Sequence, residues 1–196
     1  LHPRVRRQRQ MCIRDSFNVM SHEQVGMYAV YISTHGNMPD LFRNNPYAGE
    51  LKDPLLYDVP EEYKEADSKF AAMLEEAEKY LGYPYVWGGS APSTSFDCSG
   101  FVSWVLVNSG VKDVGRLGAT SLYGTLTPIR EDEARPGDII FFQGTLGEGV
   151  EGNDGITHCG IYVGDGMMIH CGSPISYADL SRSYWQEHFY GYARAY

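Results

Sequence analysis

The fold is decided by the stretch FDCSGF at residues 96–101 and the apolar run VSWVLV that follows it at 102–107. From Phe101 onward the run is long enough for about two turns of buried helix. Cys98 would then lie at a helix N-terminus, where exposed N–H groups and the helix dipole favour a thiolate over a thiol. Asp97 is suited to cap that helix, and Ser99 and Gly100 leave the sulfur open to an approaching carbonyl. A thiolate at neutral pH is a nucleophile.

Two histidines follow downstream, inside the strand-like runs THCGIYV at 157–163 and MMIHCG at 167–172. Either one alone could be a core histidine. If the turn between the runs holds three residues, 164–166, His170 faces Gly160 and shares a sheet face with His158. A strict two-residue Asp-Gly turn would separate them, so a catalytic pair requires the longer turn or a bulge. We interpret His158 as a base for Cys98 and His170 as the group that orients it.

The same register puts Cys159 opposite Cys171 on the other face of the hairpin. They are either two buried thiols packed on a helix or a cross-strand disulfide. The sequence has four cysteines, the fourth being Cys12, and neither a Cys-x-x-Cys nor a His-x-x-x-His pair. We therefore expect no zinc site and no cofactor.

The composition is typical of a globular protein, with 43% hydrophobic and 21% charged residues among 196. This length fits one domain plus an appendage. A net charge of −9 argues against nucleic acid as a partner. No stretch approaches the ~20 apolar residues of a membrane span. Fifteen tyrosines suit a groove for extended polar ligands.

The N-terminal end differs from the rest of the chain. Residues 1–16 hold five arginines and one aspartate, whereas the remaining residues hold 11 basic and 24 acidic side chains. The segment MCIRDS at 11–16 resembles the translated frame of a transposase sequencing adapter, and we interpret residues 1–16 as an artefact of that origin. The natural N-terminus is then missing. The alternative is an arginine-rich arm for nucleic acid or a membrane.

The remaining pattern predicts helices first and an antiparallel sheet afterwards, which is the α+β class. We expect a short helix over 17–33, a linker or wrapped extension over 34–60, and a helix from Glu61 to Leu81 capped by Gly82. An aromatic loop (83–89) and a small polar turn (90–96) precede Cys98, and residues 109–137 read as mixed and loop-rich. The later segments are a turn at 135–138, a buried strand at 139–142, a Gly-rich acidic loop at 143–156, the 157–171 hairpin and a final strand at 189–196.

Five motifs taken together resemble the NlpC/P60 peptidases of bacterial cell walls. They occur in the family's order over roughly residues 75–196, and are YPYVWGG (83–89), FDCSGF (96–101), RPGDIIFF (135–142), THCGIYVG (157–164) and MIH (168–170). The resemblance implies a papain-like α+β fold, with helices packed on an antiparallel sheet or partial barrel, and a catalytic domain over 61–196. The chain also resembles wall-cleaving modules of conjugative elements and phage-like systems. A cysteine after each histidine and the long 143–156 loop depart from the family pattern.

The resemblance also implies roles for individual residues. Cys98 would be the nucleophile, His158 the base and His170 the third polar residue. Tyr85 matches a tyrosine whose hydroxyl lies near the oxyanion and a substrate subsite. Asp97 and Ser99 match residues that help to bind the peptide. Our own interpretation of the loop before the nucleophile is that at least one of Tyr85 and Trp87 lines the cleft.

The expected function is cleavage of the D-γ-glutamyl bond to a diamino acid in peptidoglycan stem peptides, through an acyl-enzyme. The protein would act outside the cell or on its surface, as a monomeric module of a larger protein. Two rivals stay open. One is an amidase or acyltransferase with the same three residues. The other is a wall-binding module without catalysis, although a pure binder needs none of Cys98, His158 and His170.

Overall fold

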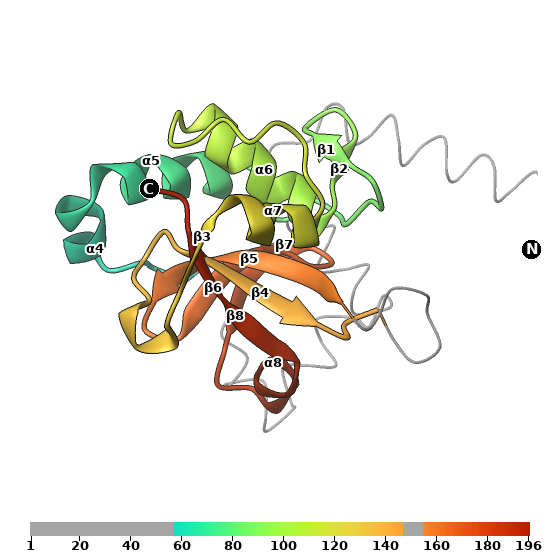
Figure 1. The fold of residues 1–196 in the computed structure, drawn as a ribbon. Coiled ribbons are helices and arrows are strands. Elements are labelled where there is room, and N and C mark those ends of the chain that lie inside the picture. Colours follow the sequence, from blue (N-terminus) through green and yellow to red (C-terminus); the bar gives the residue numbers. More distant parts are fainter. Residues whose placement is uncertain (1–56, 147–154) are drawn as a thin grey trace, which may run out of the picture.

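The computed structural model describes residues 57–146 and 155–196 (Figure 1). The predicted helix over 17–33, nearly all of the 34–60 segment and most of the 143–156 loop lie outside these residues. The chain has the predicted α+β architecture. Its elements are α4 (Glu61–Ala66), α5 (Ser68–Glu78), β1 (Ser90–Ala91), β2 (Ser95–Phe96), α6 (Cys98–Asn108), α7 (Ala119–Thr125), β3 (Thr127–Ile129), a 3₁₀ turn (Glu131–Glu133), β4 (Ile139–Gln143), β5 (Ile156–Gly164), β6 (Met167–Cys171), β7 (Ile175–Asp179), α8 (Ser183–His188) and β8 (Phe189–Arg194).

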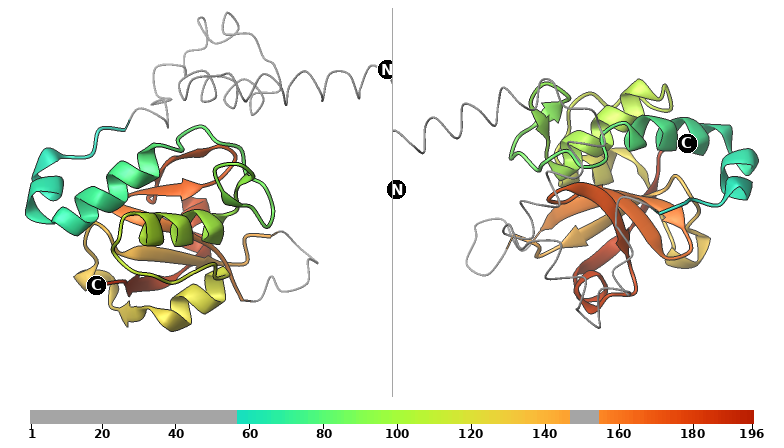
Figure 2. Two further views of the ribbon diagram at one scale, coloured as in Figure 1. Left: turned by 90° about the horizontal axis from the view of Figure 1, so that it is seen from above. Right: turned by 180° about the vertical axis from the view of Figure 1, so that it is seen from behind.

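Six of the strands form one antiparallel sheet with the order β3-β8-β4-β5-β6-β7. The helices α5, α6 and α7 lie over one face, and α8 lies on the other side (Figures 1 and 2). The predicted strands at 139–142 and 189–196 are the adjacent strands β4 and β8. Among the described residues, no helix is long and apolar enough to cross a membrane.

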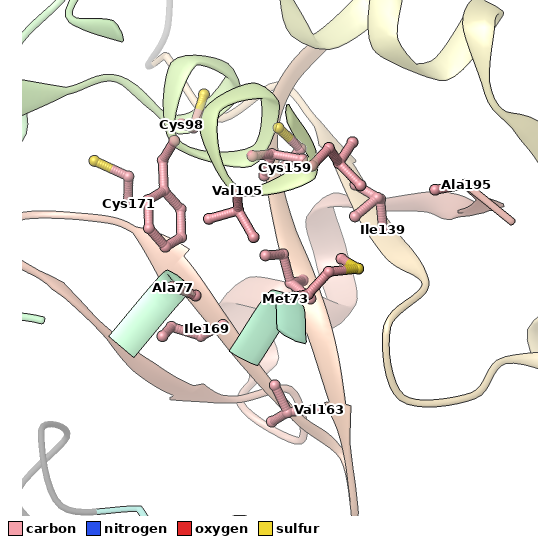
Figure 3. Packing of buried hydrophobic residues seen from close by; sticks show 14 of the residues in the cluster. Met73, Ala77, Cys98, Val105, Ile139, Cys159, Val163, Ile169, Cys171 and Ala195 are labelled. Atoms are coloured by element: carbon pink, nitrogen blue, oxygen red, sulfur yellow. The ribbon is translucent and has the colours of Figure 1, made fainter. Parts of the chain in front are cut away.

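The main core fills the space between the helices and the sheet (Figure 3). Met73 and Ala77 of α5 and Val105 of α6 pack there above the strands. Cys159 and Cys171 belong to this core, and both thiols are buried and free. A smaller apolar cluster forms on the opposite face around Phe142. The sheet is therefore covered on both faces.

The expectation of a single helix over 61–81 is wrong, because the segment forms the two helices α4 and α5. Asp67 adopts an extended conformation, with φ −142° and ψ 102°, and its carboxylate accepts from the backbone N–H groups of Lys69 and Phe70. Capping by aspartate starts a second helix there and outweighs continuation of the first. The second helix ends at Glu78, before the predicted cap. Gly82 has φ +84°, but its N–H donates to Ile175 O instead of closing the helix.

The hairpin of β5 and β6 has a two-residue Asp-Gly turn combined with a β-bulge, the second of the two arrangements that keep the histidines on one face. Asp165 and Gly166 form a tight turn with φ values of +51° and +69°. The pairing is Gly164↔Met167 at the turn but Gly160↔His170 farther along, and the register shifts between Tyr162 and Gly164. One extra residue in β5 is a β-bulge. The bulge restores the register that places His158 and His170 on one face.

Several elements were not anticipated. The segment 109–137 contains α7, β3 and the 3₁₀ turn, and the stretch before the final strand contains β7 and α8. These helices are only seven and six residues long. Segments this short carry too few apolar positions for a periodicity argument.

Candidate active site

Cys98 is the first residue of α6, as predicted. Asp97 is the N-cap, and its Oδ1 accepts from the Gly100 N–H at 2.7 Å. A Cβ on Gly100 would lie 2.1 Å from the carbonyl oxygen of Gly89, so the helix start packs directly on the backbone of the aromatic loop. The Cys98 side chain is almost completely buried, and its Sγ lies 3.8 Å from Thr157 O of β5.

The two histidines contact each other from neighbouring strands. His158 Nε2 lies 2.8 Å from His170 Nδ1, and the rings meet edge to face. Because His158 Nε2 is occupied by His170, Nδ1 is the ring nitrogen left for Cys98. His170 packs closely on the backbone of the hairpin, since a Cβ on Gly160 would lie 2.9 Å from His170 Cβ. The hairpin therefore fixes the orientation of both imidazoles.

The surroundings of Cys98 favour its thiolate. A hydrogen bond from Cys159 lowers the pKa of Cys98 well below the ordinary thiol value, and the hydrogen bond and charge of His158 act in the same direction. Desolvation by burial raises this pKa but is outweighed. Burial and the neighbouring Cys98 raise the pKa of Cys159, so this thiol keeps its proton. Cys159 therefore acts as a neutral donor to a charged sulfur.

His170 is held in its neutral form. Burial, followed by the charge of His158, lowers the pKa of His170 well below the ordinary histidine value. A neutral His170 accepts a hydrogen bond at Nδ1 when His158 carries a proton on Nε2. This arrangement fixes the orientation of the His158 ring.

Trp185 of α8 covers the histidine pair. Its ring stacks on His158 with a centroid distance of 5.7 Å and meets His170 edge to face at 5.1 Å. Phe142 of β4 contacts both Trp185 and His158, with centroid distances of 4.8 and 6.0 Å. The two imidazoles therefore pack against an aromatic ring, and His170 is buried. Trp185 was not predicted, and the cluster SYWQEH at 183–188 was the only signal for it.

The two aromatic residues predicted for the cleft lie in different environments. Burial and the negative charges of Cys98 and Asp97 raise the pKa of Tyr85, whose hydroxyl hydrogen-bonds Cys98. Tyr85 is therefore next to the sulfur. The Trp87 side chain is 75% exposed and is not brought together with the three central residues.

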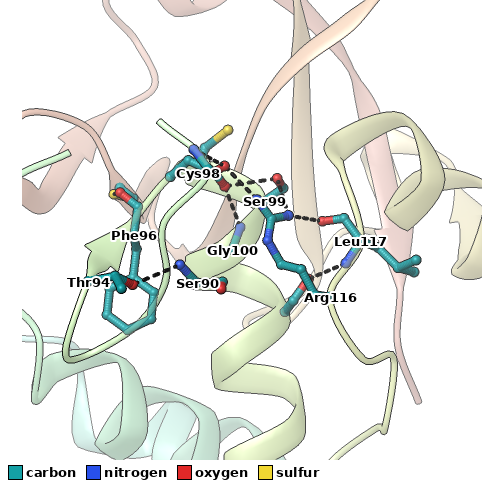
Figure 4. A network of polar contacts seen from close by, with 12 residues as sticks. Ser90, Thr94, Phe96, Cys98, Ser99, Gly100, Arg116 and Leu117 are labelled. Atoms are coloured by element: carbon teal, nitrogen blue, oxygen red, sulfur yellow. Dashed lines mark hydrogen bonds and ion pairs between the residues drawn. The ribbon is translucent and has the colours of Figure 1, made fainter. Parts of the chain in front are cut away.

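Asp97 and Ser99 lie beside Cys98 in a polar network that also contains Arg116 (Figure 4). Arg116 belongs to the loop between α6 and α7. Its Nη2 lies 2.5 Å from Asp97 Oδ2, and its Nη1 donates to Ser99 Oγ at 3.1 Å. Arg116 was missed, because nothing in the local pattern of 109–118 connects it with a residue 19 positions earlier.

The structure thus brings Cys98, His158, His170 and Tyr85 to one place, with Asp97 and Ser99 at its edge. A thiolate beside an imidazole whose second nitrogen is held by a neutral acceptor is an arrangement for nucleophilic attack on a carbonyl. No group of three or more potential metal ligands occurs among residues 57–146 and 155–196.

Comparisons with known proteins give a consistent match. The family model described as "NlpC/P60 family" matches residues 82–194. The bifunctional muramidase/DL-endopeptidase CwlT of Bacillus subtilis is 44% identical over 126 residues, covering 64% of this chain and 36% of that protein. The gamma-DL-glutamyl hydrolase of the same organism is 33% identical over 144 residues, covering 72% of this chain and 30% of that protein. The chain thus matches about a third of the length of these relatives.

A solved structure has the same fold. It comes from Staphylococcus aureus, is described as similar to lipoprotein, NLP/P60 family, and superposes with a TM-score of 0.60 at 30% sequence identity. The match covers 90% of this chain and 62% of that one.

Proposed function

The chain belongs to the NlpC/P60 family, and from this we propose that it is a peptidoglycan hydrolase with a catalytic cysteine. The bond we assign is the one between the γ-carboxyl of D-glutamate and the diamino acid of a stem peptide. The names of two relatives, a DL-endopeptidase and a gamma-DL-glutamyl hydrolase, support this substrate class.

One observation carries the proposal most strongly. The first residue of α6 is a cysteine with a lowered pKa, and the adjacent hairpin holds two imidazoles 2.8 Å apart. A binding module needs neither the thiolate nor the oriented base. We therefore assign Cys98 as nucleophile, His158 as general base and acid, and His170 as the residue that positions His158.

In the acylation step, the Cys98 thiolate attacks the γ-carbonyl carbon of D-glutamate. His158, protonated, gives its proton to the leaving amine of the diamino acid, and a thioester forms on Cys98. The neutral His170 holds the imidazole in position throughout. The carbonyl oxygen becomes negatively charged during attack, and Tyr85 is the hydroxyl beside Cys98 that we assign to stabilise it.

In the second step, His158 removes a proton from water, which attacks the thioester and releases the D-glutamate γ-carboxylate. The rings of Trp185 and Phe142 shield the imidazoles during both steps. Ser99 and Asp97, at the edge of the site, and Trp87, in the exposed loop, are assigned to substrate binding.

We assign residues 61–196 to the catalytic domain and 17–60 to a preceding segment, and we treat 1–16 as dispensable. Because stem peptides lie outside the cytoplasmic membrane, the site of action we propose is the cell wall or the surroundings of the cell. The chain would be a monomeric module of a larger protein.

The test uses the synthetic peptide L-Ala-γ-D-Glu-diamino acid, purified sacculi and casein, with products identified by mass spectrometry. We expect cleavage of the first two at the γ-linked bond and resistance of casein. Cys98→Ala and His158→Ala should each lose at least about 10³-fold in kcat/KM, because the residues act as a unit. His170→Gln should keep partial activity, because an amide still accepts a hydrogen bond from His158.

The matched control is Cys171→Ala, which removes a buried thiol outside the proposed machinery and should retain cleavage. Activity of Cys98→Ala equal to that of the unchanged protein would refute the nucleophile. Efficient casein digestion would refute the substrate class. Product that forms only when an acceptor amine is added would identify an acyltransferase instead.

A further inference from the structure

The carboxylate of Asp97 is fully occupied in the free protein. Oδ1 accepts from the Gly100 N–H at 2.7 Å and from Ser99 Oγ at 3.0 Å. Oδ2 accepts from the Gly88 N–H at 3.0 Å and from Arg116 Nη2 at 2.5 Å. A carboxylate offers about four lone-pair positions, so these four donors use all of them. A cationic substrate group would have to displace one of them.

Arg116 is the donor that also cancels the charge. Its guanidinium bonds Ser99 Oγ and Leu117 O in addition to Asp97, so it is held at three points. The loop that carries it is anchored as well, because Lys112 Nζ donates to Ala195 O and the Leu117 N–H donates to Ser103 Oγ. The guanidinium is therefore pre-organised on Asp97, and little conformational entropy is lost in keeping it there.

This ion pair bears on how the substrate's N-terminus is recognised. Asp97 directly precedes the nucleophile, and its charge acts on both Cys98 and Tyr85. An uncompensated carboxylate here would attract the free α-ammonium of a short stem peptide. With Arg116 in place, that attraction is cancelled. A peptide whose L-alanine nitrogen is acylated, as it is when attached to the glycan, carries no such charge. Its binding is therefore not weakened when Arg116 neutralises Asp97.

We infer that Arg116 is a specificity-determining residue that makes this chain accept N-acylated stem peptides at least as well as peptides with a free amine. The inference rests on the proposed function and specifies its substrate. Arg116 acts through Asp97 and takes no part in the bond-breaking steps. Its effect is confined to the ratio of kcat/KM for the free peptide to that for the acylated one.

The experiment measures this ratio with L-Ala-γ-D-Glu-diamino acid and its N-acetyl form as probes. For the unchanged protein we expect a ratio at or below about 1. Arg116→Gln exposes the Asp97 charge and should raise the ratio at least about tenfold, corresponding to about 1.4 kcal/mol. Because a peptide α-amine has a pKa near 8, the preference gained by Arg116→Gln should decline as the pH rises through about 8.

Two variants serve as comparisons. Arg116→Lys keeps the positive charge and should keep a ratio near that of the unchanged protein. Arg130→Gln breaks an exposed ion pair with Asp132 and should leave the ratio unaltered. A tenfold preference of the unchanged protein for the free peptide would overturn the inference, and this measurement requires no variant to fold. An unchanged ratio in folded Arg116→Gln would overturn it too. If neither peptide nor sacculi were cleaved, the proposed function itself would fail.

Discussion

Cys159 follows His158 in sequence but faces the opposite side of the sheet, towards α6 and Cys98. The hydrogen bond from its thiol is the largest influence lowering the pKa of Cys98. The charge of His158 and the position at a helix N-terminus act in the same direction. A buried neutral thiol thus helps to activate an adjacent one.

This arrangement predicts how the reactivity of Cys98 changes with pH. The midpoint for alkylation of Cys98 by iodoacetamide should lie well below the ordinary thiol value of about 8.5. Cys159→Ala removes the donor, so the pKa should rise, the midpoint should shift upward, and alkylation near pH 6 should slow. Cys159→Ser retains a donor and should stay closer to the unchanged protein. Mass spectrometry of the Cys98 peptide gives the rates, and identical midpoints in all three proteins would contradict the idea.

At the residue scale, the sequence predicted the positions of those side chains that follow from their neighbours along the chain. Cys98 preceded an apolar helical run, and His158 and His170 lay at a spacing that a hairpin brings together. Arg116 and Trp185 could not be found this way. Arg116 meets Asp97 because the loop between α6 and α7 returns to the site, and Trp185 meets His158 because the short helix α8 lies against the hairpin.

At the scale of elements, the start of α6 depends on a backbone contact that only glycine permits. The Cβ of an alanine at 100 would lie 2.1 Å from Gly89 O and 3.1 Å from Asp97 Oδ1. The contact holds the helix against the loop that contains Tyr85, and so keeps Tyr85 beside Cys98.

We expect Gly100→Ala to destabilise the protein by about 1–3 kcal/mol, the usual cost of forcing extra volume into a packed site. The control is Gly124→Ala in α7, where a Cβ meets nothing within 4 Å. Alanine there should stabilise the helix by about 0.5–1 kcal/mol. The free energy of unfolding in urea measures both changes. Equal effects of the two substitutions would show that the close approach at Gly100 is unimportant.

The elements themselves were predictable where the pattern was long or strongly apolar, as in α6, β4 and β8. The break between α4 and α5 shows where periodicity fails, since one capping aspartate overrides a pattern that continues across it. The sequence left two alternatives for the hairpin, a three-residue turn or a bulge. Both give the observed pairing of His170 with Gly160, and the register shift near the turn shows that the bulge is used.

At the scale of the whole molecule, a buried ion pair joins segments 56 residues apart. Arg194 of β8 makes two parallel bonds of 2.8 Å to Asp138, which is almost completely buried just before β4. Asp138 also accepts from the Arg135 N–H at 2.8 Å. The pair fixes the position of β8 against the centre of the sheet.

Arg194→Met should cost about 3–5 kcal/mol in the free energy of unfolding, because it leaves the Asp138 charge buried without its partner. The double variant Asp138→Asn/Arg194→Met removes that charge and should be less destabilised than the single one. Arg130→Met, in the exposed pair with Asp132, should cost at most about 1 kcal/mol. If Arg194→Met were as stable as the double variant or more stable, the explanation by a buried unpaired charge would be wrong.

The place of β8 in the sheet also bears on the order in which the fold can be completed during synthesis. The strand comes last in the described order, yet it lies inside the sheet between β3 and β4. Chains emerge from the ribosome N-terminus first, and pairing of distant segments is slow. The hairpin with both histidines is local, and all of its residues are made before Phe189–Arg194. A nascent chain stalled at that point carries all three proposed catalytic side chains, but β3 and β4 still expose unpaired edges where β8 belongs.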